Sequence, residues 1–510
     1  MESPLRILLL TNEQPGQSNV FIAACEALLR MEPGAELELA SYGELAEPVA
    51  AMNRRLEAAV PEARPVGFRR LRGLSPKQGL QGVMAQAGTA CEDVGASLPK
   101  SFFAPLSFSV TMRAIRDTMP IFMQYTAEHM VEAVASIEEV IVEVGADVVV
   151  VDSLLTPGLT ACRHLGVGFV CLSPNSVKDF AAMDQPLRTR LKYPALFSGF
   201  RYPVPWYSSP LNTFYKIYTV VSYVADANRR AVAGQLQKRL GAKLVTAIEA
   251  YLGNDKPKTL VGSLPELDYP GLVPPHIITC GPIMRTAPSV GESDPELEAW
   301  LARGPTVYVN LGSLFFIDEE QALEMARALA VVLGEGGGRR VLWKLKRMDE
   351  YGVAEAGHPV FDALAGVIGS ERVRIVIDWL EAEPLSILSS GHVVCAVHHG
   401  GANSFYEAVV TGVPQVVLPQ WTDTYDYAER VELLGIGRLG NRSTMPRWTA
   451  TELAEALTDV LTDGAVVRRA AGLAELCRER GSGADNAARG FWRRGGEERG
   501  LGRGERGGRG

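Results

Sequence analysis

The sequence has no excess of positive charge and no long hydrophobic run. Its 510 residues include 51 Lys and Arg against 59 Asp and Glu, which gives a net charge of −8. Because nucleic-acid binding depends mainly on Lys and Arg contacts with phosphates, this balance disfavours a general nucleic-acid-binding protein. It equally disfavours docking on an anionic membrane. No segment approaches the ~20 consecutive apolar residues that span a bilayer, so we predict no transmembrane segment.

Cysteine is scarce, and two motifs that would suggest other functions are missing. The seven cysteines form no Cys-x-x-Cys pair, which favours reduced thiols over a disulfide framework. The apolar stretch in MESPLRILLLTNE is too short for the core of a signal peptide, and we expect a cytoplasmic protein. The loop NEQPGQSN lacks the Gly-x-Gly-x-x-Gly that an NAD-dependent oxidoreductase would need after its first strand.

Short strand patterns and helix patterns alternate along the chain. Runs rich in Val, Ile and Leu occur at 6–10 and 147–152, and again in TVYVNLGS, RVLWKL, HVVCAV and VPQVVLP. Continuous apolar runs of this kind are typical of parallel strands covered on both faces. The length predicts two domains, and the Pro-rich passage YPGLVPPHIITCGPIMRTAPSVGESDP is the predicted crossing between them. We therefore predict an α/β protein with two Rossmann-like domains in tandem.

The chemically most informative stretch is CAVHHGGANSFYEAVVTGVPQVVLPQWTD. Here a predicted strand ends at His398–His399, and two glycines lead into a helix. Ligands of such domains bind at the carboxyl ends of strands, where glycines allow close approach and the helix offers free N–H groups to a phosphate. Ser404 and Glu407 also fit a capping box, which would satisfy the same N–H groups without any ligand. These residues alone leave both interpretations open.

Over some forty residues this stretch resembles the signature of the inverting UDP-glycosyltransferases, which have the GT-B fold of two Rossmann-like domains facing each other across a cleft. The shared pattern is His-Gly-Gly-x-Asn-Ser-x-x-Glu-Ala, then Gly-Val-Pro, then Pro-x-Trp-x-Asp. The segments VNLGSL, around Asn310, and DWLEAEPLSIL, from Asp378, also match. TNEQPGQSNV and the middle loops look most like the fungal branch of the plant and animal UDP-glucosyl- and glucuronosyltransferases.

The resemblance implies a division of the chain into functional parts. Residues 1–284 are the expected acceptor-binding domain, 285–297 a linker, and 298–470 the nucleotide-sugar-binding domain. Residues 471–494 are expected to form a helix that packs back on the N-terminal domain. The Gly- and Arg-rich residues 495–510 cannot pack a core and predict a disordered tail.

The resemblance also implies roles for individual residues in binding the UDP-sugar. It places the diphosphate against His399, Asn403 and Ser404, the ribose at Glu407 and the uracil on Trp379. His398 is expected to be structural. The full set of implied donor-binding residues is Gly312, Ser313, Trp379, His399, Gly401, Asn403, Ser404, Glu407, Trp421, Asp423 and Thr424. A core position for Trp379 and a helix cap at Asp423 are the structural alternatives. Thr424 stands where plant members carry Gln, which leaves the choice of sugar open.

The largest departure from the family concerns the catalytic base. Gln17 stands where family members usually hold His, and Gln cannot accept the proton of an acceptor hydroxyl. The usual partner carboxylate is present as Asp152, which we favour as the base, with Glu13 in the first loop as the alternative. The chain contains no Asp-x-Asp pair, through which metal-dependent glycosyltransferases commonly bridge the diphosphate. We expect neither a metal nor another cofactor.

These features predict transfer of a hexose, with glucose as the favoured sugar, from a UDP-sugar to a hydroxyl of a small hydrophobic acceptor. The aromatic loops between Phe180 and Tyr223 suggest the apolar acceptor surface, although they are equally compatible with packing between domains. The alternative is a catalytically impaired nucleotide-sugar-binding protein, because the usual His is missing.

Overall fold

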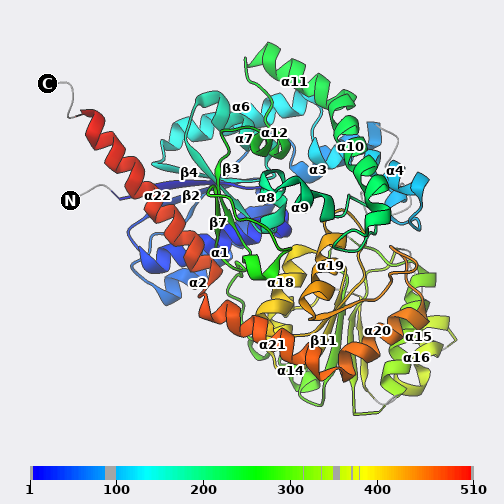
Figure 1. The fold of residues 1–510 in the computed structure, drawn as a ribbon. Helices are drawn as coiled ribbons and strands as arrows, with labels where there is room; N and C mark the ends of the chain where they lie inside the picture. The colour runs from blue at the N-terminus through cyan, green and yellow to red at the C-terminus, as the bar shows by residue number, and fades with distance from the viewer. Residues whose placement is uncertain are drawn as a thin grey trace.

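The computed structural model describes residues 4–86, 99–313, 315–334, 336–348, 357–368, 371–377 and 379–506. Two parallel sheets with helices on their faces dominate this part of the chain (Figure 1). The predicted α/β class with two Rossmann-like domains is confirmed. Asp378 and Leu314, which belong to matched segments of the sequence, and Cys91 lie outside the described residues.

The N-terminal domain is built on a seven-stranded parallel sheet in the order β3-β2-β1-β4-β5-β6-β7. Its strands are β1 (Arg6–Leu10), β2 (Glu36–Ser41), β3 (Gly67–Arg70), β4 (Val148–Asp152), β5 (Phe169–Ser173), β6 (Lys258–Val261) and β7 (Ile277–Thr279). The order reverses between β1 and β4, so a ligand site is expected beyond the carboxyl ends of these two strands.

The helices of this domain cover both faces of the sheet (Figure 1). The α-helices are α1 (Pro15–Met31), α2 (Ala46–Ala59), α3 (Pro76–Gln86), α4 (Phe108–Asp117), α5 (Met119–Phe122), α6 (Ala127–Val144), α7 (Thr156–Leu165), α8 (Val177–Ala181), α9 (Leu187–Lys192), α10 (Ser209–Ala225), α11 (Ala227–Arg239) and α12 (Ala247–Leu252). Short 3₁₀ turns are η1 (Gly43–Leu45), η2 (Lys100–Phe102), η3 (Ala182–Asp184), η4 (Trp206–Ser208) and η5 (Pro265–Leu267).

The C-terminal domain repeats this plan with a six-stranded parallel sheet in the order β10-β9-β8-β11-β12-β13. Its strands are β8 (Thr306–Asn310), β9 (Arg340–Lys344), β10 (Val373–Val376), β11 (Val393–His398), β12 (Gln415–Val417) and β13 (Gly437–Leu439). Its helices are α13 (Val290–Ser293), α14 (Pro295–Leu301), α15 (Glu319–Gly334), α16 (Pro359–Ile368), α17 (Pro384–Ser389), α18 (Ala402–Thr411), α19 (Thr424–Leu434), α20 (Ala450–Thr462) and α21 (Gly464–Glu479). Here the order reverses between β8 and β11.

The continuous apolar runs follow from the burial of both sheet faces. In β1, Ile7 and Leu9 belong to the core cluster on one face, whereas Leu8 and Leu10 belong to the cluster on the other. Successive side chains of a strand point to opposite faces, so a strand covered on both sides is apolar throughout. Because both faces are occupied, functional side chains are restricted to the loops at the strand ends.

Three boundaries differ from those predicted from sequence. Helices α13 and α14 lie within or across the predicted linker 285–297, and Val290, Leu297 and Trp300 pack in a core cluster of the C-terminal domain. The boundary at 471 falls inside α21. The last helix, α22 (Gly483–Arg506), lies beside α1 and also includes most of the segment expected to be a disordered tail (Figure 1).

α22 is attached to the N-terminal domain through its first half. Ala484, Ala487, Ala488 and Phe491 are buried in the same cluster as residues of β1 and α1. The small alanine side chains allow the helix to approach the sheet closely. The chain therefore crosses twice between the two domains, once before β8 and once after α21.

Buried polar contacts join the two domains near α19. The fully buried Arg430 donates through Nε to Asp268 Oδ1 and through Nη2 to Ser176 Oγ, both at 2.8 Å. Lys178 forms an ion pair with Asp426. Because a buried charge is costly without a partner, these contacts favour one relative placement of the domains.

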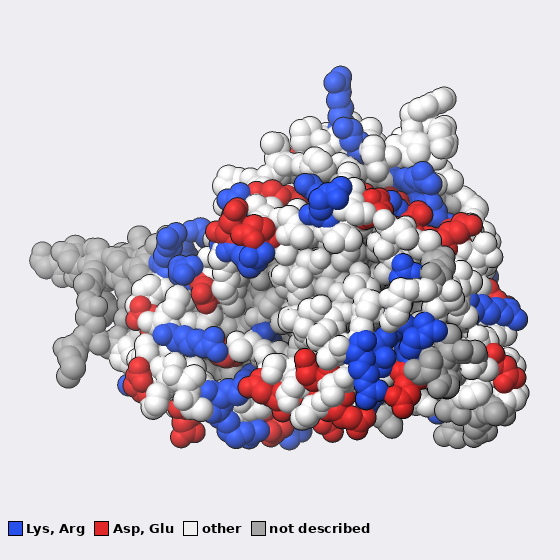
Figure 2. Space-filling model, turned by 90° about the horizontal axis from the view of Figure 1, so that it is seen from below, with Lys and Arg blue, Asp and Glu red and all other residues white. Residues whose placement is uncertain are grey.

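Three further features concern membrane-spanning helices, surface charge and cysteines. Within the described residues, no helix is long and apolar enough to cross a membrane. The face seen from below carries interspersed acidic and basic side chains (Figure 2). The six cysteines that lie in the described part of the chain are all buried and free.

Candidate functional site

The N-terminus of α18 lies at the carboxyl end of β11, directly after Gly400 and Gly401. Gly400 has φ +86°, and a Cβ there would lie 2.7 Å from the carbonyl oxygen of Thr424, so glycine is required for this turn. The helix begins at Ala402 with Gly401 as its N-cap, and no side chain caps it. Ser404 is therefore the third helical residue, and the capping-box interpretation is wrong. The first N–H groups of α18 remain available to an anion.

The two adjacent histidines have different surroundings. His398 is buried, with Nε2 2.8 Å from Gln415 Oε1 and Nδ1 accepting from the Gly400 N–H at 3.0 Å. It is structural, as predicted. His399 is only half-buried, and its Nδ1 has no hydrogen-bond partner among the described residues. Burial, with a smaller effect of His398, lowers the pKa of His399 to about 3. The ring is therefore neutral near pH 7 and can act as a hydrogen-bond donor, not as a cation.

Two glycines make room for the His399 ring. A Cβ on Gly401 would lie 2.5 Å from His399 Nε2, and a Cβ on Gly312 would lie 2.7 Å from its Cε1. Gly312 also has φ +84°, and its N–H donates to Asn310 Oδ1 at 3.1 Å. The next residue, Ser313, is exposed. The predicted phosphate loop after β8 thus lies directly against the predicted phosphate-binding histidine.

Glu407 and Trp379 have the accessibility that ligand-binding groups need. The Glu407 carboxyl is partly exposed, and burial, followed by the charge of Glu383, raises its pKa to about 8 despite the opposing charge of Arg285. Trp379 is 78% exposed, and Lys344 Nζ lies 5.5 Å from its ring centroid. The alternative that Trp379 is a core aromatic is wrong, because a large aromatic surface is left in contact with solvent.

The loop between β12 and α19 carries two of the predicted donor-binding residues, Trp421 and Asp423. Trp421 packs on His399, with ring centroids 5.4 Å apart. Thr422 has φ +28°, a strained conformation for a β-branched residue, and its Oγ1 donates to Asp423 Oδ1 at 2.8 Å. Asp423 makes no side-chain cap to α19, so the capping alternative is wrong for it as well. Burial raises the pKa of Asp423 to about 6.

Thr424 differs from its predicted role. Its side chain is buried, and Oγ1 accepts from the N–H groups of Gln420 and Trp421 at 3.0 and 2.9 Å. It also donates to the carbonyl oxygen of Trp421. A hydroxyl with these three partners holds the loop in shape and is not directed at a sugar.

On the N-terminal side, Asp152 ends β4 and is fully buried. Asn12 Nδ2 donates to its Oδ2 and the Leu154 N–H donates to its Oδ1, both at 2.9 Å. Burial raises its pKa to about 7, and the charge of Glu13 acts in the same direction. Both oxygens are thus occupied and shielded from solvent, which disagrees with our preference for Asp152 as the direct base. Asn12 was not predicted from the sequence, although a polar residue just after β1 lies at the edge of the sheet where ligands of such domains bind.

Glu13 and Gln17 each retain an oxygen without a partner. Glu13 Oε1 accepts from the Lys77 N–H at 3.2 Å, but its Oε2 and the Oε1 of Gln17 are buried and have no hydrogen-bond partner in the described structure. Glu13 is the third residue after β1 and lies close enough to Asp152 to affect its pKa. A carboxylate and an amide with unused oxygens therefore stand at the reversal point of the N-terminal sheet.

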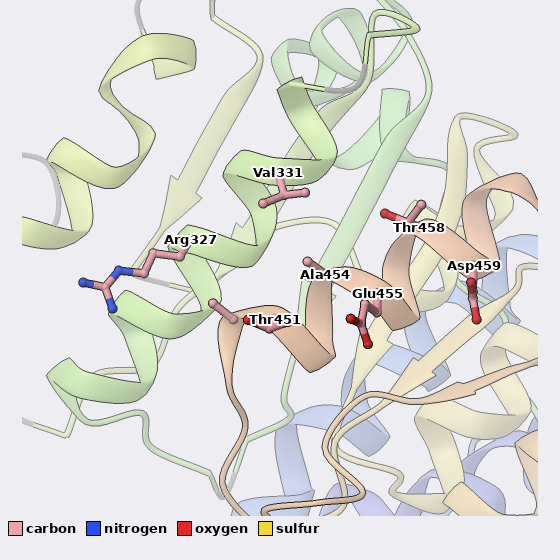
Figure 3. A pocket seen from close by; sticks show the side chains of 8 residues that line it. Arg327, Val331, Thr451, Ala454, Glu455, Thr458 and Asp459 are labelled. Atoms are coloured by element: carbon pink, nitrogen blue, oxygen red, sulfur yellow. The ribbon is translucent and has the colours of Figure 1, made fainter.

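A surface groove lies elsewhere in the C-terminal domain. It runs between α15 and α20, where Arg327 and Val331 face Thr451, Ala454 and Glu455 (Figure 3). This groove is on the outer helices of the C-terminal domain, not at the carboxyl ends of β8 and β11. Among the described residues, no group of three or more His, Cys, Asp and Glu side chains is arranged to hold a metal ion.

Comparisons with known proteins find similarity to glycosyltransferases. A family model described as the erythromycin biosynthesis protein CIII-like C-terminal domain matches residues 368–483. Glycosyltransferase sdnJ of Sordaria araneosa is 40% identical over 302 residues, covering 58% of this chain and 57% of that protein. UDP-glycosyltransferase CGT of Oryza sativa subsp. indica is 28% identical over 229 residues, covering 42% of this chain and 46% of that protein. The alignments thus span less than two thirds of these relatives.

Solved glycosyltransferases share the fold over nearly the whole chain. The glycotransferase of kitacinnamycin has a TM-score of 0.60 at 18% identity and covers 97% of this chain and 100% of its own. A UDP-glucose: anthocyanidin 3-O-glucosyltransferase in complex with UDP has a TM-score of 0.61 at 14% identity, with coverage of 98% and 100%. The two sheets therefore form a GT-B fold. In sequence, the chain is similar to glycosyltransferases over part of its length.

Proposed function

We propose that this protein is an inverting glycosyltransferase that moves a hexose, glucose first among the candidates, from a UDP-sugar to a hydroxyl of a small hydrophobic acceptor. The observation that carries the proposal is the uncapped N-terminus of α18, which stands beside the unpartnered Nδ1 of His399 and the glycine loop after β8. Free N–H groups, a helix dipole and a neutral imidazole donor suit a diphosphate.

The donor is oriented by residues around this anion site. Glu407, on the first turns of α18, accepts hydrogen bonds from the ribose hydroxyls, and the exposed Trp379 stacks on the uracil. Asp423, with its oxygen held by Thr422, accepts from hydroxyls of the sugar. His399 and the α18 N–H groups stabilise the negative charge that develops on the leaving UDP.

The reaction forms one bond and breaks one. The acceptor oxygen attacks the anomeric carbon as its proton passes to a carboxylate, and the electron pair of the bond to the diphosphate leaves with UDP, which inverts the anomeric centre. We assign the proton to Glu13, because its Oε2 has no partner, whereas both oxygens of Asp152 are occupied. Gln17 orients the acceptor through its unpartnered Oε1. No cofactor or metal enters this proposal.

The acceptor class is inferred from the aromatic side chains of the N-terminal domain and from a solved structure with the same fold. Phe197, Tyr215 and Tyr223 pack in a cluster that also contains Phe405 and Tyr425 of the C-terminal domain, so much of the aromatic segment serves domain packing. One solved structure with the same fold is named for an anthocyanidin, a hydroxylated aromatic acceptor. This supports the expectation of a small, largely apolar alcohol or phenol.

The experiment is release of UDP from UDP-glucose, UDP-galactose, UDP-xylose and UDP-glucuronic acid with a panel of phenols, sterols and aliphatic alcohols. The proposal expects acceptor-dependent UDP release and a product with inverted anomeric configuration. Gln17 in place of His favours a second candidate, a nucleotide-sugar-binding protein without turnover. Tight binding of UDP-sugar with no release across the panel would support that candidate instead.

A further inference from the structure

Helix α10 buries one face and leaves the opposite face apolar and exposed. Asn212, Tyr215 and Tyr223 face the domain. The exposed apolar side chains of the helix are Leu211, Phe214, Ile217, Val220, Val221 and Val224. The positions 214, 217, 221 and 224, three or four apart, place these side chains on one face of the helix. A contiguous apolar patch of this kind, unlike a single exposed leucine, marks an interaction surface.

The patch continues onto the neighbouring elements. Trp206 is 85% exposed and, with the exposed Tyr207, lies in η4 directly before α10, while Leu187 and Leu191 are exposed on α9. Both elements contact α10, which lies at the outer edge of the N-terminal domain (Figure 1). Trp and Tyr combine an apolar ring with a polar group, and they are enriched where hydrocarbon meets water.

The segment that contains α9, η4 and α10 is positively charged, whereas the protein as a whole is negatively charged. Residues 185–225 contain five cations, Arg188, Arg190, Lys192, Arg201 and Lys216, and no Asp or Glu, although the whole chain has a net charge of −8. The two acids that bracket the segment are engaged elsewhere. Asp184 pairs with Lys256 at 2.5 Å, and Asp226 accepts from the Arg229 N–H at 2.7 Å. The apolar patch is thus flanked by positive charge.

We propose that α10, η4 and α9 together form a docking surface for the anionic face of a lipid bilayer. Apolar side chains and Trp206 enter the interface, and the arginines and lysine of α9 meet the headgroups, as in other interfacial helices. The net charge led us to expect no such docking. That expectation considered the net charge of the whole chain. Because charges beyond about 8 Å are screened at physiological ionic strength, the charge close to the patch determines its attraction to an anionic membrane.

A second copy of the chain is the competing occupant. In a two-fold dimer the same surface meets itself, so the cations of both copies would lie along one interface. The segment 185–225 supplies no carboxylate to neutralise them. An anionic lipid surface satisfies both properties of the patch, its apolar face and its positive charge.

The test is co-sedimentation of the full chain, without nucleotide sugar or acceptor, with vesicles of phosphatidylcholine alone or mixed with phosphatidylserine. The proposal expects binding to the mixed vesicles that weakens in high salt. Ile217→Asn with Val221→Asn should lower partitioning at least about tenfold, because two apolar contacts are lost. Arg188→Gln should lower it about fivefold.

The matched control is Val142→Asn with Val467→Asn, two exposed apolar positions on α6 and α21. This variant should bind vesicles like the unchanged protein. No binding to mixed vesicles, or equal loss in both double variants, would overturn the proposal. A dimer in light scattering that Ile217→Asn with Val221→Asn converts to a monomer would assign the surface to a second copy. Since no sugar donor is present, none of these outcomes bears on the proposed transfer reaction.

Discussion

Asn403 Nδ2 donates a hydrogen bond to the carbonyl oxygen of Pro15 at 3.4 Å, and this contact joins the N-termini of α18 and α1. Neither helix has a side-chain cap. Two positive helix ends therefore approach each other, one from each domain, at the reversal points of the two sheets. An anion held there would be stabilised from both sides.

The contact between His399 and Gly401 predicts that substitutions at these two positions have non-additive effects on the unfolding free energy. Gly401→Ala should destabilise the protein by about 1–3 kcal/mol, because the new methyl group overlaps the His399 ring, which Gly312 encloses from the other side. In the His399→Ala background most of this penalty should disappear. Urea unfolding of both single variants and the double variant measures the coupling. Additive losses would show that the ring and the glycine do not constrain each other.

Glu407 predicts a pH dependence of donor binding. Its pKa is raised to about 8, and the ribose hydroxyls require the ionised carboxylate as acceptor. The affinity for UDP-glucose, which has no phosphate group that titrates in this range, should therefore rise as the pH increases from 6 to 9, by up to about tenfold for each pH unit below 8 and levelling off above it. Glu407→Gln should bind more weakly at pH 9 and lose the dependence. Calorimetry over this range tests the claim, and an unchanged slope in the variant would contradict it.

Glu13 and Asp152 should respond differently to neutralisation. Glu13→Gln removes the proposed proton acceptor, so kcat should fall by about 10²–10⁴-fold with little change in UDP affinity. Asp152→Asn should alter stability more than the chemical step, because the carboxyl is buried and fully hydrogen-bonded. If Asp152→Asn abolished turnover while Glu13→Gln left it intact, the assignment of the base would have to be reversed.

Asp152 also predicts how stability changes with pH. Its folded pKa of about 7 is above the ordinary value of 3.8, so the folded protein binds the proton more tightly than the unfolded chain. This contribution is complete below about pH 4 and is lost as the pH rises towards 7, with a slope of at most about 1.4 kcal/mol per pH unit. The difference between the unfolding free energies of the unchanged protein and Asp152→Asn isolates it. A difference that is constant from pH 4 to 8 would contradict the raised pKa.

Substitution of Trp379 should lower UDP affinity with little effect on the stability of the fold. Because it is 78% exposed, Trp379→Ala should change the unfolding free energy by less than about 0.5 kcal/mol. Loss of stacking should lower UDP affinity by about five- to tenfold, and Trp379→Phe should restore most of it. The exposed Trp206 provides the matched control, and Trp206→Ala should leave UDP affinity unchanged. Equal affinity in both alanine variants would place the uracil elsewhere.

The sequence predicted the fold well because its signals were redundant. Continuous apolar strands alternated with helices, and the stretch from His398 to Asp423 added a pattern that resembles proteins with this fold. It did not predict the start of α18, because Ser404 and Glu407 fit a capping box equally well and only backbone geometry distinguishes the two. Nor did it predict that Thr424 turns inward or that Asn12 holds Asp152, since such hydrogen bonds depend on tertiary placement. The exposure of the apolar face of α10 could not be predicted either, because an apolar helix face gives the same sequence pattern whether or not it is covered.

A crystal structure with UDP bound tests the central claim most directly. The account predicts the diphosphate against the N–H groups of residues 402–404, within hydrogen-bond distance of His399, with the uracil on Trp379. Diphosphate density elsewhere, for example in the groove between α15 and α20, would contradict it.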